Sequence, residues 1–130
     1  MGQPAAKEGD QVVAIDIHVI MVPSPSGLVP TPIPHPFSGR LDGALSSNVY
    51  IEGKLAATVD STASNQPPHT PIGGSFQSPP SDTSTVKRGS VKVFINGKAA
   101  ARAGDTAETC NDPSDLQAGA IVASSTVFIG

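Results

Sequence analysis

Four side chains in this 130-residue sequence can bind a transition metal, and they are spread along most of the chain. They are the three histidines, His18, His35 and His69, and the one cysteine, Cys110. Three imidazoles and one thiolate complete a tetrahedral shell around Zn²⁺, and a shell without an open position is structural rather than catalytic. The four residues lack the close ligand spacing of a zinc finger, and widely separated His and Cys residues are usually unrelated. The residues alone therefore leave two interpretations open, a structural zinc site and four unconnected side chains.

Nucleophilic catalysis by Cys110 with a histidine partner is the other chemistry open to these residues. No His, Cys or carboxylate lies in a recognisable reaction motif, and the Asp and Ser residues are typical of turns. We therefore expect no enzyme activity. A small zinc-dependent or Cys-nucleophile secreted effector or hydrolase is kept as the alternative. The carboxylates weighed for it are Asp16, Asp42, Asp60, Asp82 and Asp105.

The composition predicts a thin core that needs a covalent or metal cross-link. Hydrophobic residues make up 38%, there is no Trp, and Gly and Pro number 13 each. A single cysteine cannot form an intramolecular disulfide. Binding of a structural Zn²⁺ contributes on the order of 10 kcal/mol at neutral pH, enough to offset the entropy of ordering Gly- and Pro-rich segments.

The charges and the N-terminus exclude several classes of protein. Eight basic and 11 acidic residues are scattered along the chain, which argues against a nucleic-acid surface. No window is apolar enough for a transmembrane helix, and residues 1–8 lack the basic-then-apolar order of a signal peptide. We expect a protein made in the cytoplasm without a signal peptide.

One short segment recurs 44 residues further along the chain. The copies are residues 49–58, VYIEGKLAAT, and residues 93–102, VFINGKAAAR. Val-aromatic-Ile favours a strand, and Asn96-Gly97 is the preferred dipeptide of a type I′ hairpin turn, where Glu52-Gly53 stands in the first copy. The repeat predicts two β-hairpins.

A third copy is completed only when the two ends of the chain are joined. Residues 127–130, VFIG, supply its first strand, and residues 4–10, PAAKEGD, supply its second strand and the Gly-Asp pair that also follows the second copy. Three strand pairs, one split between the termini, predict a closed three-fold base with the chain ends close together.

The segments between the hairpins have a different composition. Residues 19–47 and 63–91 are rich in proline, which lacks an amide N–H, so we expect long loops rather than helices or interior strands. Residues 112–119, DPSDLQAG, have the capping pattern of one helical turn. The predicted fold is all-β, a short three-fold pseudo-symmetric β cone with long Pro-rich loops and little or no helix. Each excursion brings at least one candidate ligand toward the cone axis.

These motifs resemble the PAAR-repeat family of spike tips. The resemblance rests on residues 93–105, VFINGKAAARAGD, and on Pro4-Ala5-Ala6-Lys7 with Gly9-Asp10. The family's tetrapeptide is nowhere complete, and the Pro-rich stretch 23–36 is longer than in the simplest members. The resemblance covers essentially the whole chain and implies a single PAAR-like domain over residues 1–130 with no toxin extension.

What the resemblance implies is a structural tip rather than an enzyme. The family forms a short cone that caps the trimeric β-helical spike of type VI secretion systems and of related phage-tail-like and extracellular devices. It implies a structural Zn²⁺ near the apex, whose ligands here would be His18, His35, His69 and Cys110. The implied partner is a trimeric valine-glycine-repeat-type spike carrying one copy of this chain, with effectors possible, transient contact with a target membrane, and export when the device fires.

The alternation of side chains in the hairpins predicts two faces. Tyr50, Phe94 and Phe128 lie on the opposite side from the core and are the candidate partner-binding residues; the alternative is that these aromatics pack within the domain. A small β module that binds carbohydrate is a third possible function. The predicted core-facing residues are Val49, Ile51, Val93, Ile95, Val127 and Ile129.

Overall fold

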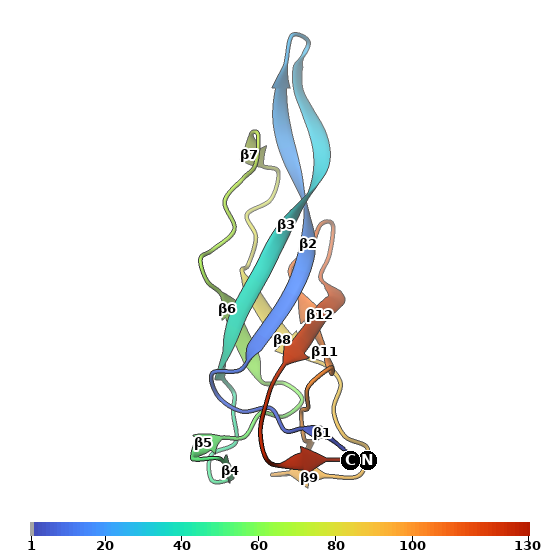
Figure 1. Cartoon of the computed structure of the whole chain (residues 1–130). Helices are drawn as coiled ribbons and strands as arrows, with labels where there is room; N and C mark the ends of the chain where they lie inside the picture. Colours follow the sequence, from blue (N-terminus) through green and yellow to red (C-terminus); the bar gives the residue numbers. More distant parts are fainter. Residues whose placement is uncertain (1) are drawn as a thin grey trace.

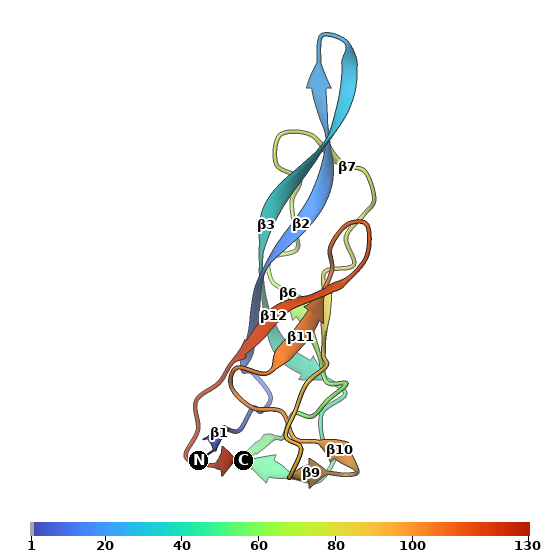
Figure 2. The same cartoon turned by 90° about the vertical axis from the view of Figure 1, so that its right-hand side faces the viewer.

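The computed structural model describes residues 2–130 as a long, narrow molecule built from 13 β-strands, with no helix among them. The all-β prediction is confirmed. The two chain ends lie together at one end of the molecule, here called the base, and a long hairpin forms the opposite end (Figures 1 and 2). No helix in the described residues is long and apolar enough to cross a membrane.

Three short strand pairs form the base, as the repeats predict. Both central residues of the first two turns have positive φ, 52° and 82° at Glu52-Gly53 and 52° and 81° at Asn96-Gly97, as a type I′ turn requires. The third pair joins the two termini. The pairs are β4 (Tyr50–Ile51) with β5 (Lys54–Leu55), β9 (Phe94–Ile95) with β10 (Lys98–Ala99), and β1 (Gln3–Pro4) with β13 (Phe128–Ile129).

Backbone hydrogen bonds connect the three pairs in a cycle. Ala6 N donates to Ala101 O, Ala101 N donates to Ala57 O, and Ala57 N donates to Ala6 O, each at 3.0 Å. All three alanines are fully buried. Each repeat thus has the same contact with the next, which is the arrangement expected of a three-fold base. The segments above the base differ in length, so the three-fold cone of the whole molecule stays a prediction.

Above the base, six antiparallel strands close into a narrow barrel. Pairing of β12 with both β11 and β2 completes the ring β12-β11-β8-β6-β3-β2, and β7 (Ser75–Phe76) adds to the edge of β2. Val12, Phe37 and Leu41 are among the buried side chains at its centre. The barrel strands are β2 (Gln11–Ser24), β3 (Gly27–Gly43), β6 (Thr62–Asn65), β8 (Thr83–Val86), β11 (Thr106–Thr109) and β12 (Leu116–Val122).

The expectation of a loop over residues 19–47 is wrong, because most of this segment lies in strands β2 and β3. These strands pair without interruption from Gln11 with Arg40 to Ser24 with Gly27. Successive residues of a strand direct their N–H groups to opposite edges. The prolines of β3 occupy alternate positions, 30, 32, 34 and 36, so they all face the edge away from β2 and leave the pairing intact. Strand β6 pairs only with Gly39–Gly43, which makes the proline-bearing half of β3 an edge strand, where proline is tolerated.

The segment 63–91 contains β6, β7 and β8, separated by longer stretches without regular structure. The prediction of a Pro-rich loop therefore holds only for the parts between these strands.

The helical turn predicted over residues 112–119 is also wrong. The side chain of Asp112 accepts a hydrogen bond from Val19 N at 2.8 Å, and Asp112 N donates to Ile17 O at 2.8 Å. These bonds tie the segment to the edge of β2 instead of capping a helix. Leu116–Val122 then forms β12, which pairs with β11 and with the lower part of β2.

Candidate metal centre

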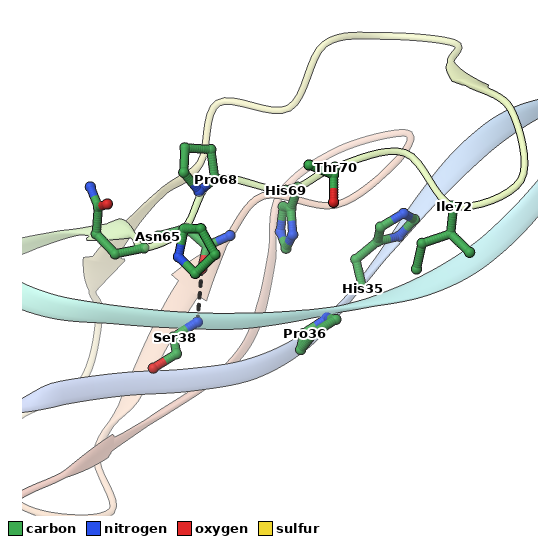
Figure 3. A pocket seen from close by; sticks show the side chains of 10 residues that line it. His35, Pro36, Ser38, Asn65, Pro68, His69, Thr70 and Ile72 are labelled. Carbon is green, nitrogen blue, oxygen red and sulfur yellow. Dashed lines mark hydrogen bonds between the residues drawn. The ribbon is translucent and has the colours of Figure 1, made fainter.

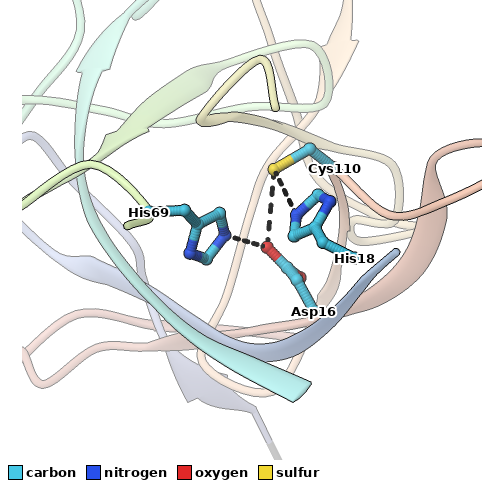
Figure 4. Close-up of side chains that lie close together, drawn as sticks. All are labelled: Asp16, His18, His69 and Cys110. Carbon is cyan, nitrogen blue, oxygen red and sulfur yellow. Dashed lines mark hydrogen bonds and ion pairs between the residues drawn. The ribbon is translucent and has the colours of Figure 1, made fainter. Parts of the chain in front are cut away.

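A buried cluster of titratable side chains lies inside the barrel, well above the base. One candidate ligand atom from each of Asp16, His18, His69 and Cys110 lies within 4.8 Å of the others, and all four residues are buried. The side chains point toward one another from separate parts of the chain (Figure 4). Asp16 and His18 come from β2, His69 from the segment between β6 and β7, and Cys110 from the residue after β11.

Strand alternation explains why β2 contributes two members. Residues two apart in a strand face the same side, and the buried positions of β2 include residues 16, 18 and 20. His35 of β3 is directly paired with Asp16, and it too is buried. The β2–β3 hairpin therefore places three polar side chains inside the barrel at one level.

Asp16 is the most heavily hydrogen-bonded member of the cluster. Its Oδ1 accepts from the Thr109 hydroxyl at 2.6 Å and lies 3.4 Å from Asn111 Nδ2. Its Oδ2 lies 2.9 Å from His69 Nε2 and 3.5 Å from Cys110 Sγ. A fully buried carboxylate needs such donors, because an unpaired one would be expensive to remove from water.

His35 lies beside this group with one ring nitrogen free. Its Nδ1 is 2.8 Å from Ile33 O and donates to it, so the neutral form of this ring has its lone pair on Nε2. That buried Nε2 has no hydrogen-bond partner among the described residues. The ring centroid of His35 is 5.6 Å from that of His18 and 5.7 Å from that of His69.

His18 and Cys110 lie next to each other, and burial shifts the pKa of both side chains. His18 Nε2 lies 3.6 Å from Cys110 Sγ, and His18 Nδ1 lies 3.6 Å from Asp112 Oδ2 without a hydrogen bond. Burial, followed by the neighbouring His69, lowers the pKa of His18 despite the opposing effect of Asp112 and Asp16. The neutral imidazole that results is the form that binds metals.

Burial also raises the pKa of the Cys110 thiol, to about 11, and the nearby Asp16 carboxylate adds to the effect. Without a cation the thiol stays protonated at neutral pH. A bound divalent metal would displace that proton, because the thiolate is the metal ligand.

A cavity of about 300 Å³ lies next to the cluster and is lined by His35 and His69 (Figure 3). Pro36, Pro68 and Ile72 form part of its wall. The two histidines that line this cavity are otherwise enclosed by the barrel.

The structure thus brings together His18, His69 and Cys110, three of the residues singled out in the sequence, with His35 immediately beside them. Asp16 was weighed only as a catalytic carboxylate and missed as a member of this cluster. Its position two residues before His18 in an alternating strand is the signal that could have found it.

The donor set fits a bound metal. Imidazoles and a thiolate suit Zn²⁺, the unpartnered Nε2 of His35 can offer a lone pair to a metal, and the candidate ligands are buried. The Nδ1 bond from His35 to a backbone carbonyl is the outer contact that metal-binding histidines generally have.

The base carries the second set of predicted residues. The side chains of Tyr50, Phe94 and Phe128 are 62%, 60% and 62% exposed, so the alternative that they pack within the domain is wrong.

The predicted core-facing residues of the base are only partly buried. Ile51, Ile95 and Ile129 are buried and form a cluster with Ala5, Ala56 and Ala100, and Val49 packs against it. Val93 and Val127 are exposed, contrary to expectation, although Val49 at the equivalent position of the first copy packs against the cluster.

Comparison with known proteins gives one result that bears on identity. No curated protein matches the chain. Residues 35–108 match the PAAR motif family, which is more than half of the sequence and includes both complete hairpins of the base. Members of this family are structural components of the spikes of contractile injection systems. The repeats, the cyclic base and this match together show that the chain belongs to the PAAR motif family.

Proposed function

We propose that the protein is the structural tip that caps and sharpens the trimeric β-helical spike of a contractile injection device. The observation that carries the proposal is the cyclic base, in which three strand pairs repeat the same backbone contacts and each exposes one aromatic side chain. Family membership associates the chain with such spikes, of type VI secretion or of a related phage-tail-like or extracellular system. On firing, the tip would leave the cell with the spike, aiding puncture and effector delivery.

A trimeric partner explains the otherwise unfavourable exposure at the base. Tyr50, Phe94 and Phe128 occupy the same position in the three pairs, and Val93 and Val127 beside them are also exposed. Contiguous exposed apolar side chains mark interaction surfaces. Each strand of a trimer would meet one near-equivalent pair, and the short open strands of the base could continue the sheets of the spike.

Size-exclusion chromatography with a trimeric valine-glycine-repeat-type spike protein from the same organism tests the docking. We expect the chain to co-elute with the trimer, and the triple variant Y50E/F94E/F128E to elute alone. L116E is the matched control, since Leu116 is 53% exposed on β12 above the base. Co-elution of the triple variant at wild-type level, or failure of the wild-type chain to bind, would overturn the proposed docking.

We infer that the buried cluster holds one structural Zn²⁺ through His18, His35, His69 and Cys110. Both oxygens of Asp16 already have hydrogen-bonding neighbours, whereas His35 Nε2 has none. Asp16 then serves as the outer carboxylate that orients His69 through its Nε2, so His69 would bind the ion through Nδ1. Through Thr109, Asp16 also fixes the end of β11. The ion would supply cross-links between β2, β3, the His69 segment and the end of β11.

The alternative of a cysteine-dependent hydrolase has little support from the site. A thiol with a pKa of about 11 is ionised in only about one molecule in ten thousand at pH 7. Cys110 is also 3% exposed, so a substrate would not reach it. A reactive cysteine normally has a lowered pKa and partial exposure.

Metal analysis of protein purified without chelator tests the zinc site. We expect close to one zinc per chain in the wild type and much less in H35A. A chelator should lower the melting temperature of the wild type and leave Cys110 slow to react as long as the fold persists. A folded, metal-free protein whose Cys110 is labelled rapidly would favour the hydrolase.

A further inference from the structure

The far end of the molecule is a two-stranded arm formed by residues 19–34 of β2 and β3. It extends beyond the barrel and beyond β7, and it ends in a two-residue turn at Pro25 and Ser26 (Figures 1 and 2). Strand β7 pairs with it only at Ile20 and Met21. The arm is the part of the chain furthest from the base.

The arm carries no charged side chain. Between Asp16 and Arg40 the sequence contains no Asp, Glu, Lys or Arg. Close to its turn, Leu28 and Val29 are 60% and 45% exposed. A surface protrusion in water normally carries charges, so a neutral arm with apolar side chains near its end is unusual for a solvated element.

Hydrogen bonds lower in the barrel show which residues of β3 face its outer edge. Ser38 N donates to Asn65 Oδ1 at 2.9 Å, and Ser38 O accepts from Gln66 N at 2.9 Å, so even-numbered residues direct their backbone groups away from β2. The even-numbered residues from 30 to 36 are all proline. The outer edge of β3 over this stretch therefore has no N–H group to leave unpaired.

The backbone N–H groups on the outer edge of β2 are either paired with side chains or removed by proline. Near the barrel, Ile17 N and Val19 N donate to the side chains of Asn111 and Asp112, at 2.6 Å and 2.8 Å. Odd-numbered residues of β2 thus face outward, and further along the arm the outward position 23 is proline. Both edges of the arm are therefore nearly free of unpaired backbone donors.

These features remove two of the costs of entering a nonpolar solvent, the unpaired N–H donors and the charged side chains. The outward C=O groups of the proline positions have no strand partner, and water at the lipid interface would be their donor. From Met21 to the turn the arm spans roughly 13 Å at about 3.3 Å per residue, close to half of a bilayer core of about 30 Å. Such an arm can enter one leaflet without breaking its own hydrogen bonds.

We propose that the arm, residues 19–34, is the segment that enters the first leaflet of the target membrane, and that its prolines serve to remove unpaired N–H groups from the part that meets lipid. The proposal rests on the proposed function, which places the base against the spike and so directs the arm outward. A protein partner that adds a strand to the arm is disfavoured, because the proline edge of β3 offers it no donors.

Tryptophan fluorescence with phosphatidylcholine vesicles tests this directly, since the chain has no Trp. At millimolar lipid we expect the emission of L28W to shift to shorter wavelength and to be quenched by brominated lipids. L116W, at a similarly exposed site on β12, should show neither change. Equal emission of L28W with and without vesicles would overturn the proposal.

Restoring the missing donors separates lipid entry from simple protection of a strand edge. We expect the variant P30T/P32T/P34T, made in the L28W background, to bind vesicles about tenfold more weakly. Circular dichroism checks that its fold is kept. Self-association with unchanged vesicle binding would instead show that the prolines only prevent edge-to-edge pairing. Co-elution with the spike trimer, measured on the same variants, tests the proposed function separately from the arm.

Discussion

At the scale of single residues, Asp16 and His35 differ most within the candidate metal centre. They face each other across β2 and β3, yet their environments differ, since Asp16 has several donors around it and His35 Nε2 has no partner. The environment of Asp16 is typical of a carboxylate that supports a metal ligand from outside the coordination shell. The environment of His35 is typical of a metal ligand.

This difference predicts unequal effects of substitution on zinc binding. D16N should keep one zinc per chain but weaken the affinity by about 10–100-fold, as removal of outer-shell partners typically does. H35A removes a ligand and should lose the ion during dialysis. Competition with a chromophoric chelator measures both. T109V, which removes one donor to Asp16, is the milder control for damage to the fold. Retention of tight binding by H35A with loss in D16N would make Asp16 the ligand in its place.

The backbone conformation of one turn gives a second residue-scale prediction. Asp60 has φ of 79°, and Gly9 and Gly104 occupy the corresponding turns of the other two repeats at 91° and 87°. Left-handed conformation costs a residue with a β-carbon about 1–2 kcal/mol, and the exposed ion pair of Asp60 with Lys98 adds little.

We therefore expect D60G to be at least as stable as the wild type, and D60V to be less stable by about 1–2 kcal/mol, in urea unfolding. A D60V protein as stable as D60G would show that this turn does not constrain the backbone.

At the scale of elements, the base is held together in part by contacts between the turn of one strand pair and the residues just before the next pair. Glu52 in the first hairpin turn accepts from Thr126 N at 2.9 Å and from the Thr126 hydroxyl at 2.8 Å. The Thr126 backbone N–H, and then the hydroxyl, lower the pKa of Glu52 below its ordinary value of 4.5.

The lowered pKa of Glu52 fixes the sign of a pH effect. The charged carboxylate stabilises the folded base above pH 4.5, and this contribution is lost as the pH falls through the lower pKa of the folded state. The wild type should therefore be more stable than E52Q at pH 7, with the difference shrinking toward pH 3. Chemical unfolding at several pH values measures it. A difference that does not change with pH would mean that the charge of Glu52 has no part in the contact.

The elements also show where prediction from the sequence stops. The base hairpins and the pairing of the termini were predictable because strand propensity, turn chemistry and an internal repeat agree there. The strand over the Pro-rich stretch was not, because proline is excluded only when its N–H position faces a neighbour, and the edge to which residues 30–36 point is a property of the assembled sheet. The helical turn at residues 112–119 failed for the same kind of reason, since the carboxylate of Asp112 bonds to β2, which is distant in sequence.

At the scale of the whole molecule, three regions of different character lie along one axis. The base has a cycle of backbone hydrogen bonds and exposed aromatic side chains, and the barrel encloses the candidate metal centre. The arm at the far end is uncharged and has prolines along one edge (Figure 1). His18, His69 and Cys110 could be proposed from residue type alone, because the chain has so few candidates. Their meeting point depends on closure of the barrel, which the sequence does not state.

The proposed function requires that one copy of this chain caps one trimeric spike. Native mass spectrometry of the complex formed with a trimeric spike protein from the same organism measures this stoichiometry. We expect a mass equal to three spike subunits, one copy of this chain and one zinc ion. Three copies of the chain per trimer, or no complex at concentrations where the trimer itself is intact, would contradict it.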